Sequence, residues 1–407
     1  MNCCLLGRTL GHSYSPQIHR MLGDYTYQLF EKEPEDLEDF LLHGDFRGLN
    51  VTIPYKQAVI PYLRELSPIA RRLGAVNTIV RKPDGSLKGH NTDFFGFCRM
   101  ADSLHVDLRG KKALVLGTGG ASKPVCAALQ DRGAQVVSIS RSGENNYQNL
   151  SLHRDAALIV NATPVGMYPQ VGISPVDLSL FPHLEGVLDL IYNPARTQLL
   201  LDAESRGIPV RNGLLMLVAQ AWESAQWFLD APLPEDKIPA IHRAMQQTVE
   251  NLILIGMPGS GKSTVGRLAA RALGREFVDA DRVLEETYGP IPEIFKNQGE
   301  EGFRRLETQI LSQLGRQSSL VIATGGGCVT RPENYPLLHQ NGRIFCLHRP
   351  LKDLTSKGRP LSQSRGVEAL YAERAPLYAK FSDCTVENTG TPQAAADEIL
   401  RKWEETP

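Results

Sequence analysis

A glycine-rich segment in the second half of the chain has the residue types needed to hold a nucleotide. The stretch NLILIGMPGSGKSTVGRLAARALG contains the pattern G-x-x-x-x-G-K-S between an apolar run and a helical pattern. Glycines at this spacing let backbone N–H groups surround phosphates, and the positive end of the following helix adds to the attraction. The lysine would reach the β- and γ-phosphates, and the serine would be a ligand of Mg²⁺. The predicted nucleotide-binding residues are Gly256, Gly259, Ser260, Gly261, Lys262, Ser263 and Thr264, with Lys262 also expected to be catalytic.

Two aspartates follow the next apolar run, in FVDADRVLEETYG. Asp279 and Asp281 stand two positions apart at the end of a predicted strand. We expect their carboxylates to point in different directions, so that one serves Mg²⁺ and the other serves the hydroxyl group that accepts the phosphoryl group. The phosphate loop by itself does not select that acceptor.

A second glycine turn lies in the first half, within KKALVLGTGGASKPVCAALQDRGAQVVSISRS. This segment reads as strand, turn, helix and strand, with serine where the dinucleotide-binding fingerprint usually has Gly or Ala. NAD sites usually place an acid at the end of the second strand, whereas this strand ends in Ser-Arg-Ser. A cation with two hydroxyls suits a 2′-phosphate, which favours NADP. The predicted dinucleotide contacts are Gly117, Thr118, Gly119, Gly120, Ala121, Ser122, Ser140, Arg141 and Ser142.

The elements that must position these residues are short apolar strands alternating with amphipathic helices. This order predicts an α/β fold with parallel sheets covered by helices. Clear strands are expected at Leu49–Ile53, Lys112–Leu116, Gln135–Ser140, Ala157–Asn161, Gly186–Asp189, Asn251–Ile255, Leu320–Ala323 and Arg343–Leu347. The best domain boundary follows Asp230, where a segment with three prolines leads into a helix over 240–248, and a new architecture begins near residue 249.

Composition excludes several classes of function. The 407 residues carry a formal net charge of −1, which argues against nucleic acid or an anionic membrane as the main partner. No apolar run is long enough to span a bilayer, and the N-terminus has no basic region typical of a signal peptide. The scattered cysteines, without a C-x-x-C metal motif, indicate buried reduced thiols in a cytoplasmic protein. The sequence does not indicate an oligomeric state.

The first half carries a dense series of further motifs: LGHSYSPQIH, GLNVTIPYK, GAVNTI, GHNTDFFG, NATPVGM, DLIYNP and NGLLMLVAQA. In this order they resemble the shikimate dehydrogenase family over about residues 1–247. The resemblance implies a substrate domain over 1–95 that is completed by 214–247, and a Rossmann domain for NADP(H) over 96–213. It also implies that Gly213 contacts the cofactor. The implied contacts to the substrate 3-dehydroshikimate are Ser13, Ser15, Thr52, Asn77, Asp93, Tyr192 and Gln220.

Within that resemblance, Lys56 and Asp93 match the catalytic pair. Hydride reduction of a ketone generates an alkoxide that needs a proton, so a positioned ammonium group can polarise the oxygen and donate. A neighbouring carboxylate can orient the lysine and take part in proton transfer. A lysine after a proline is more commonly a solvated turn residue. The motif context favours catalysis for Lys56.

The second half continues with GEEGFRRLE, ATGGGCV, GRPL and ERAPLY. With the phosphate loop and the aspartates, this series resembles the shikimate kinase family over about residues 249–407. The resemblance implies that Asp279 supports Mg²⁺ and that catalytic Asp281 holds the hydroxyl groups of shikimate. Arg304 and Arg374 match arginines that grip the substrate carboxylate, for which a bidentate guanidinium is suited. Gly326 and Gly327 match a loop that approaches the ring, and the catalytic Arg359 matches a lid arginine that reaches the transferred phosphoryl group.

One part of the kinase pattern departs from the family. The segment LHRPLKDLTSKGRPLSQSRGVEAL is compact and shows no match for the basic residue that stacks on adenine. The adenine contacts are therefore left unassigned.

The combined expectation is a bifunctional enzyme with small-molecule substrates. It would use NADPH to reduce 3-dehydroshikimate to shikimate, and then ATP with Mg²⁺ to phosphorylate shikimate. One alternative is a quinate-type dehydrogenase joined to another small-molecule kinase. Another is a regulatory binding protein built on a dehydrogenase-like half, for which the loss of Lys56 or Asp93 would have been evidence.

Overall fold

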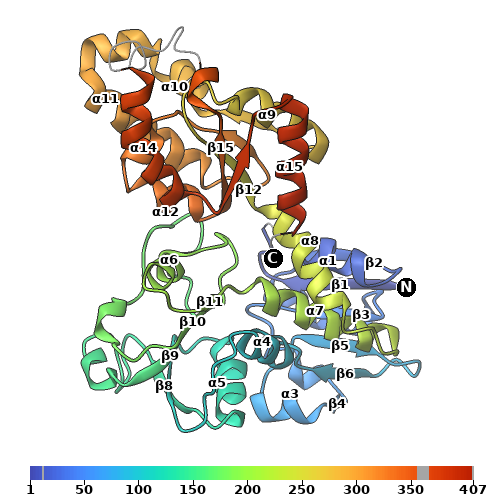
Figure 1. Ribbon diagram of the computed structural model, residues 1–407. Helices are drawn as coiled ribbons and strands as arrows, with labels where there is room; N and C mark the ends of the chain where they lie inside the picture. The colour runs from blue at the N-terminus through green and yellow to red at the C-terminus, as the bar shows by residue number, and fades with distance from the viewer. Residues whose placement is uncertain (12, 355–365, 406–407) are drawn as a thin grey trace. The chain divides into compact units, whose positions relative to one another are not determined.

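The computed structural model describes residues 1–11, 13–354 and 366–405. The chain divides into two compact units. The first comprises Met1–Tyr192 and Thr197–Met245, and the second comprises Asn193–Arg196 and Gln246–Pro407. Three sheets carry the architecture, two in the first unit and one in the second (Figure 1). Among the described residues, no helix combines the length and apolarity needed to cross a bilayer.

The first sheet has six strands in the order β2-β1-β3-β5-β6-β4. They are β1 (Asn2–Gly7), β2 (Thr26–Glu31), β3 (Gly48–Val51), β4 (Glu65–Leu66), β5 (Thr78–Arg81) and β6 (Leu87–His90). β5 runs antiparallel to both β3 and β6, which the sequence pattern did not predict. Side chains alternate between the two faces of a strand, so Leu49 and Val51 pack into a core that includes Leu41 on one face. Cys3 and Val80 contact Phe228 on the other.

The helices of this part are α1 (Ser15–Leu22), α2 (Leu37–His43), α3 (Pro68–Leu73), α4 (Asp93–Asp102), α7 (Leu214–Leu229) and α8 (Lys237–Val249). Ser67 caps α3 by accepting a hydrogen bond from the Ala70 N–H, as expected for a serine at a helix N-terminus. Glycine is needed where β3 passes α7, because a Cβ on Gly48 would lie 2.2 Å from the Phe228 ring. That close approach lets α7 lie against the sheet and bring its polar side chains toward the strand ends.

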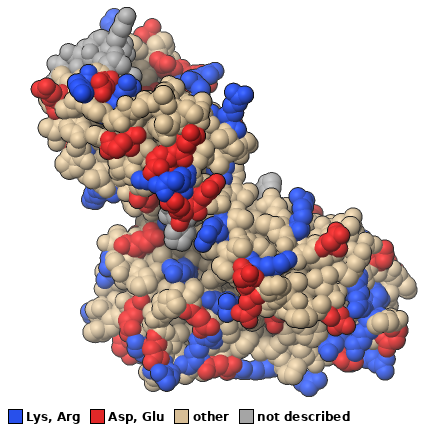
Figure 2. Space-filling model, turned by 45° about the vertical axis from the view of Figure 1, so that its right-hand side comes forward, with Lys and Arg blue, Asp and Glu red and all other residues tan. Residues whose placement is uncertain are grey.

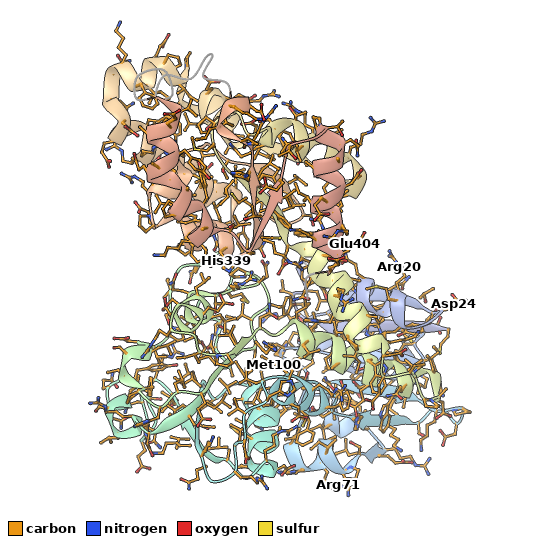
Figure 3. All side chains as sticks on the ribbon, viewed as in Figure 1. Arg20, Asp24, Arg71, Met100, His339 and Glu404 are labelled. Carbon is orange, nitrogen blue, oxygen red and sulfur yellow. The ribbon has the colours of Figure 1, made fainter. Side chains whose placement is uncertain are left out.

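The second sheet has five parallel strands in the order β11-β10-β9-β7-β8. They are β7 (Lys112–Leu116), β8 (Gln135–Ile139), β9 (Ala156–Asn161), β10 (Gly186–Asp189) and β11 (Val210–Arg211), with helices α5 (Ser122–Asp131) and α6 (Gln198–Ser205). Val115 belongs to a core with residues of α4 and α5, and Leu114 to a core with residues of α6. Met100 on α4, labelled in Figure 3, is fully buried in the first of these cores.

The third sheet lies in the second unit, with five parallel strands in the order β13-β14-β12-β15-β16. They are β12 (Asn251–Ile255), β13 (Phe277–Asp279), β14 (Val321–Ala323), β15 (Gly342–His348) and β16 (Cys384–Glu387). Helices α9 (Lys262–Leu273) and α15 (Pro392–Glu405) share a core with Leu252 and Leu254. Ile253 and Ile255 face the opposite core. The helices on that side are α10 (Ala280–Tyr288), α11 (Ile291–Leu314), α12 (Asn334–His339) and α14 (Val367–Phe381).

Basic and acidic side chains are interspersed over the face shown in Figure 2, without a continuous field of one sign. The chain has 44 basic and 45 acidic residues. A mixed surface of this kind is typical of proteins with small-molecule ligands rather than polyanionic partners.

Candidate active sites

The first unit contains a cavity of about 330 Å³. Its walls come from the ends of β1 and β3, from Asn77 just before β5, from the start of α4 and from one face of α7. Every residue that the sequence assigned to the dehydrogenase substrate or to catalysis lines this cavity: Ser13, Ser15, Thr52, Lys56, Asn77, Asp93, Tyr192 and Gln220. Residues up to 207 positions apart thus meet at one site. These residues lie around one cavity, as they must if they are to act on the same ligand.

Lys56 and Asp93 form an ion pair in the cavity wall. The distance from Lys56 Nζ to Asp93 Oδ2 is 2.7 Å, and the side chains are only 19% and 13% exposed. Lys56 lies in the turn after β3, and its backbone oxygen accepts a hydrogen bond from the Val76 N–H at 2.7 Å. Asp93 is the first residue of α4, where the positive end of the helix favours a carboxylate. The ammonium group is therefore both oriented and able to face a ligand.

Ser13, Ser15 and Tyr192 bring hydroxyl groups to the same cavity. The Ser15 backbone N–H donates to Ser13 Oγ at 3.3 Å, which holds the two serines together at the start of α1. The rings of Tyr14 and Tyr192 lie 5.5 Å apart. Burial, and secondarily Tyr14, raises the pKa of Tyr192 above its ordinary value, so the phenol keeps its proton and can donate a hydrogen bond.

The glycine turn after β7 lies at the switch point of the second sheet, where β7 has β8 on one side and β9 on the other. Open parallel sheets bind ligands at the carboxyl ends of strands at such a point. Gly117 has φ 103°, a conformation that favours glycine, and a Cβ there would lie 2.9 Å from Thr163. Cβ atoms on Gly119 and Gly120 would meet nothing within 4 Å, which leaves room over the turn for a ligand. Ala121, at the end of the turn, lines the substrate cavity.

The end of β8 presents the Ser-Arg-Ser sequence beside the glycine turn. The last residues of β7 and β8, Leu116 and Ile139, are paired with each other. The Gly117 N–H donates to the Ile139 oxygen at 2.8 Å. Arg141 is exposed, and no carboxylate precedes it at the strand end. This arrangement fits a dinucleotide with a phosphate on its ribose. Gly213 lines the substrate cavity, and a Cβ there would lie 2.0 Å from the Leu190 oxygen, so only glycine fits.

The second unit contains a larger cavity, of about 620 Å³. It is lined by most of the residues that the sequence assigned to the kinase reaction: Gly259, Gly261, Lys262, Ser263, Thr264, Asp279, Asp281, Arg304, Gly326, Gly327 and Arg374. Gly256 and Ser260 belong to the loop but do not line the cavity. Arg359 lies outside the described residues. Apolar side chains of α11, among them Phe295 and Phe303, form the remaining wall and suit a carbon ring.

The phosphate loop connects β12 to α9. Its glycines, Gly256, Gly259 and Gly261, all have positive φ, which other residues adopt only with strain. Lys262 Nζ lies 2.8 Å from the Gly256 oxygen and 3.1 Å from the Met257 oxygen, so the lysine folds back along the loop. Ser263 Oγ donates to Asp279 Oδ2 at 2.6 Å. A hydroxyl and a carboxylate are oxygen ligands of the kind Mg²⁺ prefers, so this pair fits the expected metal.

The positions of the two aspartates show that one prediction was wrong, namely that both stand at the end of a strand with carboxylates pointing in different directions. Residues two apart on a strand would share a face, but the strand ends at Asp279. Asp279 caps α10 by accepting from the N–H groups of Asp281 and Arg282, and Asp281 lies in the first turn of that helix. Both carboxylates nevertheless line the cavity. Burial, and then repulsion from Glu307 and Asp279, raises the pKa of Asp281 to about 7.

A third carboxylate, Glu307, was missed by the sequence interpretation. Arg304 Nη1 donates to Glu307 Oε2 at 2.7 Å, and both side chains are more than 90% buried. The spacing of three positions on a predicted helix was the available signal, because such residues share a face. A Cβ on Gly325 would lie 2.4 Å from Glu307 Oε1 and 2.7 Å from Asp281 Oδ1, which places these two acids on the same side of the cavity.

Arg374 lines the cavity from α14 and is 1% exposed. Its Nη1 donates to the Gly326 oxygen at 3.2 Å, while Nε and Nη2 have no partner among the described residues. A buried guanidinium with unsatisfied donors fits a ligand carboxylate. Arg349, which follows β15, also lines this cavity and was not assigned from the sequence.

Comparisons with known proteins find relatives for both parts of the chain. A model of the shikimate dehydrogenase substrate binding domain matches residues 5–79, and a model of shikimate kinase matches residues 258–404. The shikimate dehydrogenase (NADP(+)) of Caldanaerobacter subterraneus subsp. tengcongensis is 37% identical over 245 residues, which are 53% of this chain and 87% of that protein. The enzyme of Clostridium beijerinckii is 36% identical over 249 residues, covering 54% and 92%.

Solved structures show the same relationship to shikimate dehydrogenases. A chorismate mutase/shikimate 5-dehydrogenase fusion protein from Clostridium acetobutylicum matches with a TM-score of 0.57 and 35% identity, over 60% of this chain and 97% of that one. The shikimate 5-dehydrogenase of Thermus thermophilus in complex with NADP(H) and shikimate matches with a TM-score of 0.55 and 32% identity, over 60% and 99%. The chain therefore belongs to the shikimate dehydrogenase family and carries a shikimate kinase domain over residues 258–404.

Proposed function

We propose that the chain is a bifunctional enzyme that reduces 3-dehydroshikimate to shikimate with NADPH and then phosphorylates shikimate with ATP. The observation that carries this proposal is that the dehydrogenase residues line one cavity and most of the kinase residues line another. Residues 1–95, completed by 214–247, would bind the first substrate, residues 96–213 the dinucleotide, and residues 249–407 would carry out the second reaction. The family matches support the same assignment.

The dehydrogenase cavity supplies binding and proton transfer. When NADPH is bound on the glycine turn, it supplies a hydride. Ser13 and Ser15 would hold the substrate carboxylate with their hydroxyl groups, and the amides of Asn77 and Gln220 would hold ring hydroxyls. Lys56 would donate a proton from Nζ to the carbonyl oxygen, while Asp93 stabilises the ammonium group at 2.7 Å and limits its rotation. Arg141, with Ser140 and Ser142, would bind the 2′-phosphate.

The residues of the kinase cavity would orient the substrate and supply charges that hold the phosphates, the metal and the substrate carboxylate. ATP with Mg²⁺ supplies the phosphoryl group, and Lys262, Ser263 and Asp279 would hold the phosphates and the metal. Arg304 and Arg374 would fix the substrate carboxylate, which turns one ring hydroxyl toward Asp281. In its ionised form, Asp281 can accept the proton of that hydroxyl group as the oxygen attacks phosphorus. Arg359 is proposed to reach the transferred group.

Two points of the proposal go beyond the family relationship. A quinate dehydrogenase from Corynebacterium glutamicum in complex with NAD matches the fold with 27% identity and a TM-score of 0.55 over 60% of this chain. Selectivity for NADP over NAD is therefore proposed from the strand end at Arg141. We also propose a cytoplasmic location, supported by seven cysteines that are all free thiols.

A coupled assay tests the proposal. Purified protein is incubated with 3-dehydroshikimate, NADPH, ATP and Mg²⁺, and the products are identified by mass. The expected result is oxidation of NADPH and ATP-dependent formation of a phosphorylated shikimate. Quinate with NAD or NADP is run in parallel. Turnover of quinate alone, or no phosphorylated product, would contradict the assignment.

A further inference from the structure

Three buried hydroxyl groups lie behind the dehydrogenase cavity. They belong to Thr78 on β5, Thr92 just before α4 and Ser224 on α7, and each of these residues is fully buried. None of the three lines the cavity. We call them the hydroxyl cluster. They come from positions up to 146 residues apart, so only the tertiary fold brings them together.

The members of the hydroxyl cluster are within hydrogen-bond distance of one another. Ser224 Oγ lies 2.9 Å from Thr78 Oγ1 and 3.1 Å from Thr92 Oγ1, and the two threonine oxygens are 3.3 Å apart. Asn50 Nδ2 donates to Ser224 Oγ at 2.9 Å. A closed polar network of this kind is rigid, because a buried group that lost its partner would remain unsatisfied.

This cluster determines which end of the Asn77 amide faces the ligand. Asn77 Oδ1 accepts from the Thr92 backbone N–H at 2.8 Å, and it lies 3.1 Å from Thr78 Oγ1 and 3.2 Å from Thr92 Oγ1. Asn77 Nδ2 donates one hydrogen to Thr92 Oγ1 at 3.0 Å. The oxygen is fully engaged behind the wall, which leaves the second Nδ2 hydrogen for the cavity that Asn77 lines.

The side-chain amide of Gln220 is oriented like that of Asn77, with its oxygen toward the hydroxyl cluster. Its Oε1 lies 3.4 Å from Thr92 Oγ1, its Nε2 donates to the Leu217 oxygen at 2.9 Å, and its backbone oxygen accepts from Ser224 Oγ at 2.9 Å. The second Nε2 hydrogen is again the one not engaged by these contacts. Two amide N–H groups on neighbouring elements therefore form one wall of the cavity.

We propose that Thr78 and Ser224 are positioning residues that, with Thr92, turn Asn77 and Gln220 so that this wall presents hydrogen-bond donors. The wall would recognise oxygen lone pairs on the substrate ring and reject analogues that carry hydrogen or an ammonium group at those positions. This inference rests on the proposed dehydrogenase function, because it assigns a ligand to the same cavity. It adds the orientation of the amides and the residues that determine it.

Replacement of Thr78 tests the inference, since valine has nearly the same shape without the hydroxyl. We expect Thr78→Val to raise the KM for 3-dehydroshikimate about tenfold, the usual effect of one lost hydrogen bond, with the KM for NADPH unchanged. Thr78→Ser should behave like the wild type. Phe228→Leu, which loosens the packing of α7 without touching the hydroxyl cluster, serves as a control for lost stability and should leave KM unaltered.

A double-mutant cycle decides whether Thr78 acts through Asn77. In an Asn77→Ala background, Thr78→Val should add less than about a twofold change in KM. Additive effects, or a wild-type KM in Thr78→Val, would overturn the inference while leaving the proposed function intact. A wild-type KM in Asn77→Ala would instead remove the proposed substrate contact, and the inference with it. If Thr78→Val does not fold, Ser224→Ala is measured in the same cycle against Gln220→Ala.

Discussion

Asp281 is the residue that we propose as the proton acceptor in the kinase cavity. It lies at the start of α10 with Glu307 and Asp279 as its acidic neighbours, and burial with this repulsion raises its pKa to about 7. The positive charges of Lys262 and Arg304 oppose that shift of the pKa. A carboxyl group that ionises near neutral pH is well matched to accept a proton from a hydroxyl group. The same feature is expected to make both activity and stability depend on pH.

The kinase activity is expected to follow the ionisation of the Asp281 carboxyl group. Below about pH 7 the folded protein holds this carboxyl group protonated, and the protonated form cannot accept the proton of shikimate. The kcat/KM for phosphorylation should therefore fall about tenfold per pH unit below 7 and level off above it. Dehydrogenase activity of the same preparation is the internal control for inactivation. A kinase profile that stays flat down to about pH 5.5 would contradict the role.

Ionisation of Asp281 is expected to favour kinase activity but to lower the stability of the fold. The pKa in the folded protein is about 7, above the value of about 3.9 expected for an unfolded chain. Between these values the folded state holds a proton that the unfolded state has lost, so this group destabilises the fold increasingly as pH rises to 7. Asp281→Asn should raise the free energy of unfolding of the second unit by roughly 1–4 kcal/mol at about pH 8 and change it little at about pH 4.5. Denaturant titration at both pH values, with Asp397→Asn as an exposed control, measures the difference.

At the scale of elements, helix α11 supplies one side of the kinase cavity. It spans Ile291–Leu314, with a non-helical glycine at Gly299, and carries Phe295, Phe303 and Arg304 to the same wall. The Arg304–Glu307 pair lies on the buried face of this helix, whereas the adjacent Arg305 is exposed. One helix therefore contains both a buried arginine proposed to bind the substrate and a matched arginine that should not.

The difference in burial between Arg304 and Arg305 on α11 leads to a prediction for shikimate binding. Arg304→Gln should weaken shikimate binding by about 30-fold or more, because it removes a buried charge that would pair with the substrate carboxylate. ATP binding should change less than about threefold, since the phosphates are held by other residues. Arg305→Gln is the control and should resemble the wild type. Calorimetric titration of each ligand checks both statements, and an unaltered shikimate Kd in Arg304→Gln would remove this arginine from the site.

The end of strand β8 is the second element with a specific consequence. Its register with β7 places Ser140, Arg141 and Ser142 beside the glycine turn. Arg141→Ala should raise the KM for NADPH by about tenfold to 100-fold and leave the KM for NADH nearly unchanged, since only the former carries a 2′-phosphate. Arg109→Ala, an exposed arginine paired with Asp107, is the control. Equal use of NADH and NADPH by the wild type would show that this strand end does not select the cofactor.

At the scale of the whole molecule, the two sites draw on separate parts of the chain. The residues that line the first cavity fall between 5 and 220, and those of the second fall between 258 and 374. Each unit has its own buried cores. Since no lining residue is common to both cavities, neither site depends on a catalytic group of the other.

This separation predicts independent loss of the two activities. Lys56→Ala should lower reduction by about 100-fold or more and leave shikimate phosphorylation within about twofold of the wild type, and Lys262→Ala should do the reverse. Mixing the two variants should restore the full conversion, because shikimate can diffuse between molecules. Lys82→Ala and Lys380→Ala are the lysine controls. Loss of both activities in either folded variant would show that the sites are coupled.

The sequence alone determined the features that depend on contiguous residues. The phosphate loop was predicted because its glycines and Gly-Lys-Ser run are needed at fixed spacing, and their positive φ values agree with that need. The strands at Lys112–Leu116, Gly186–Asp189 and Asn251–Ile255 have the bounds that their apolar runs predicted. The match to two families follows from the same local motifs.

Only the tertiary structure decided the features that depend on packing between distant segments. The raised pKa of Asp281 comes first from burial and then from repulsion by Glu307, which belongs to another helix, and the proposed orientation of Asn77 depends on Ser224 on α7 and Thr92 before α4. The antiparallel pairing of β5 had no signal in the alternation of apolar residues. Burial and electrostatic repulsion depend on which side chains become neighbours, and a linear sequence does not state that for residues 15 to 147 positions apart.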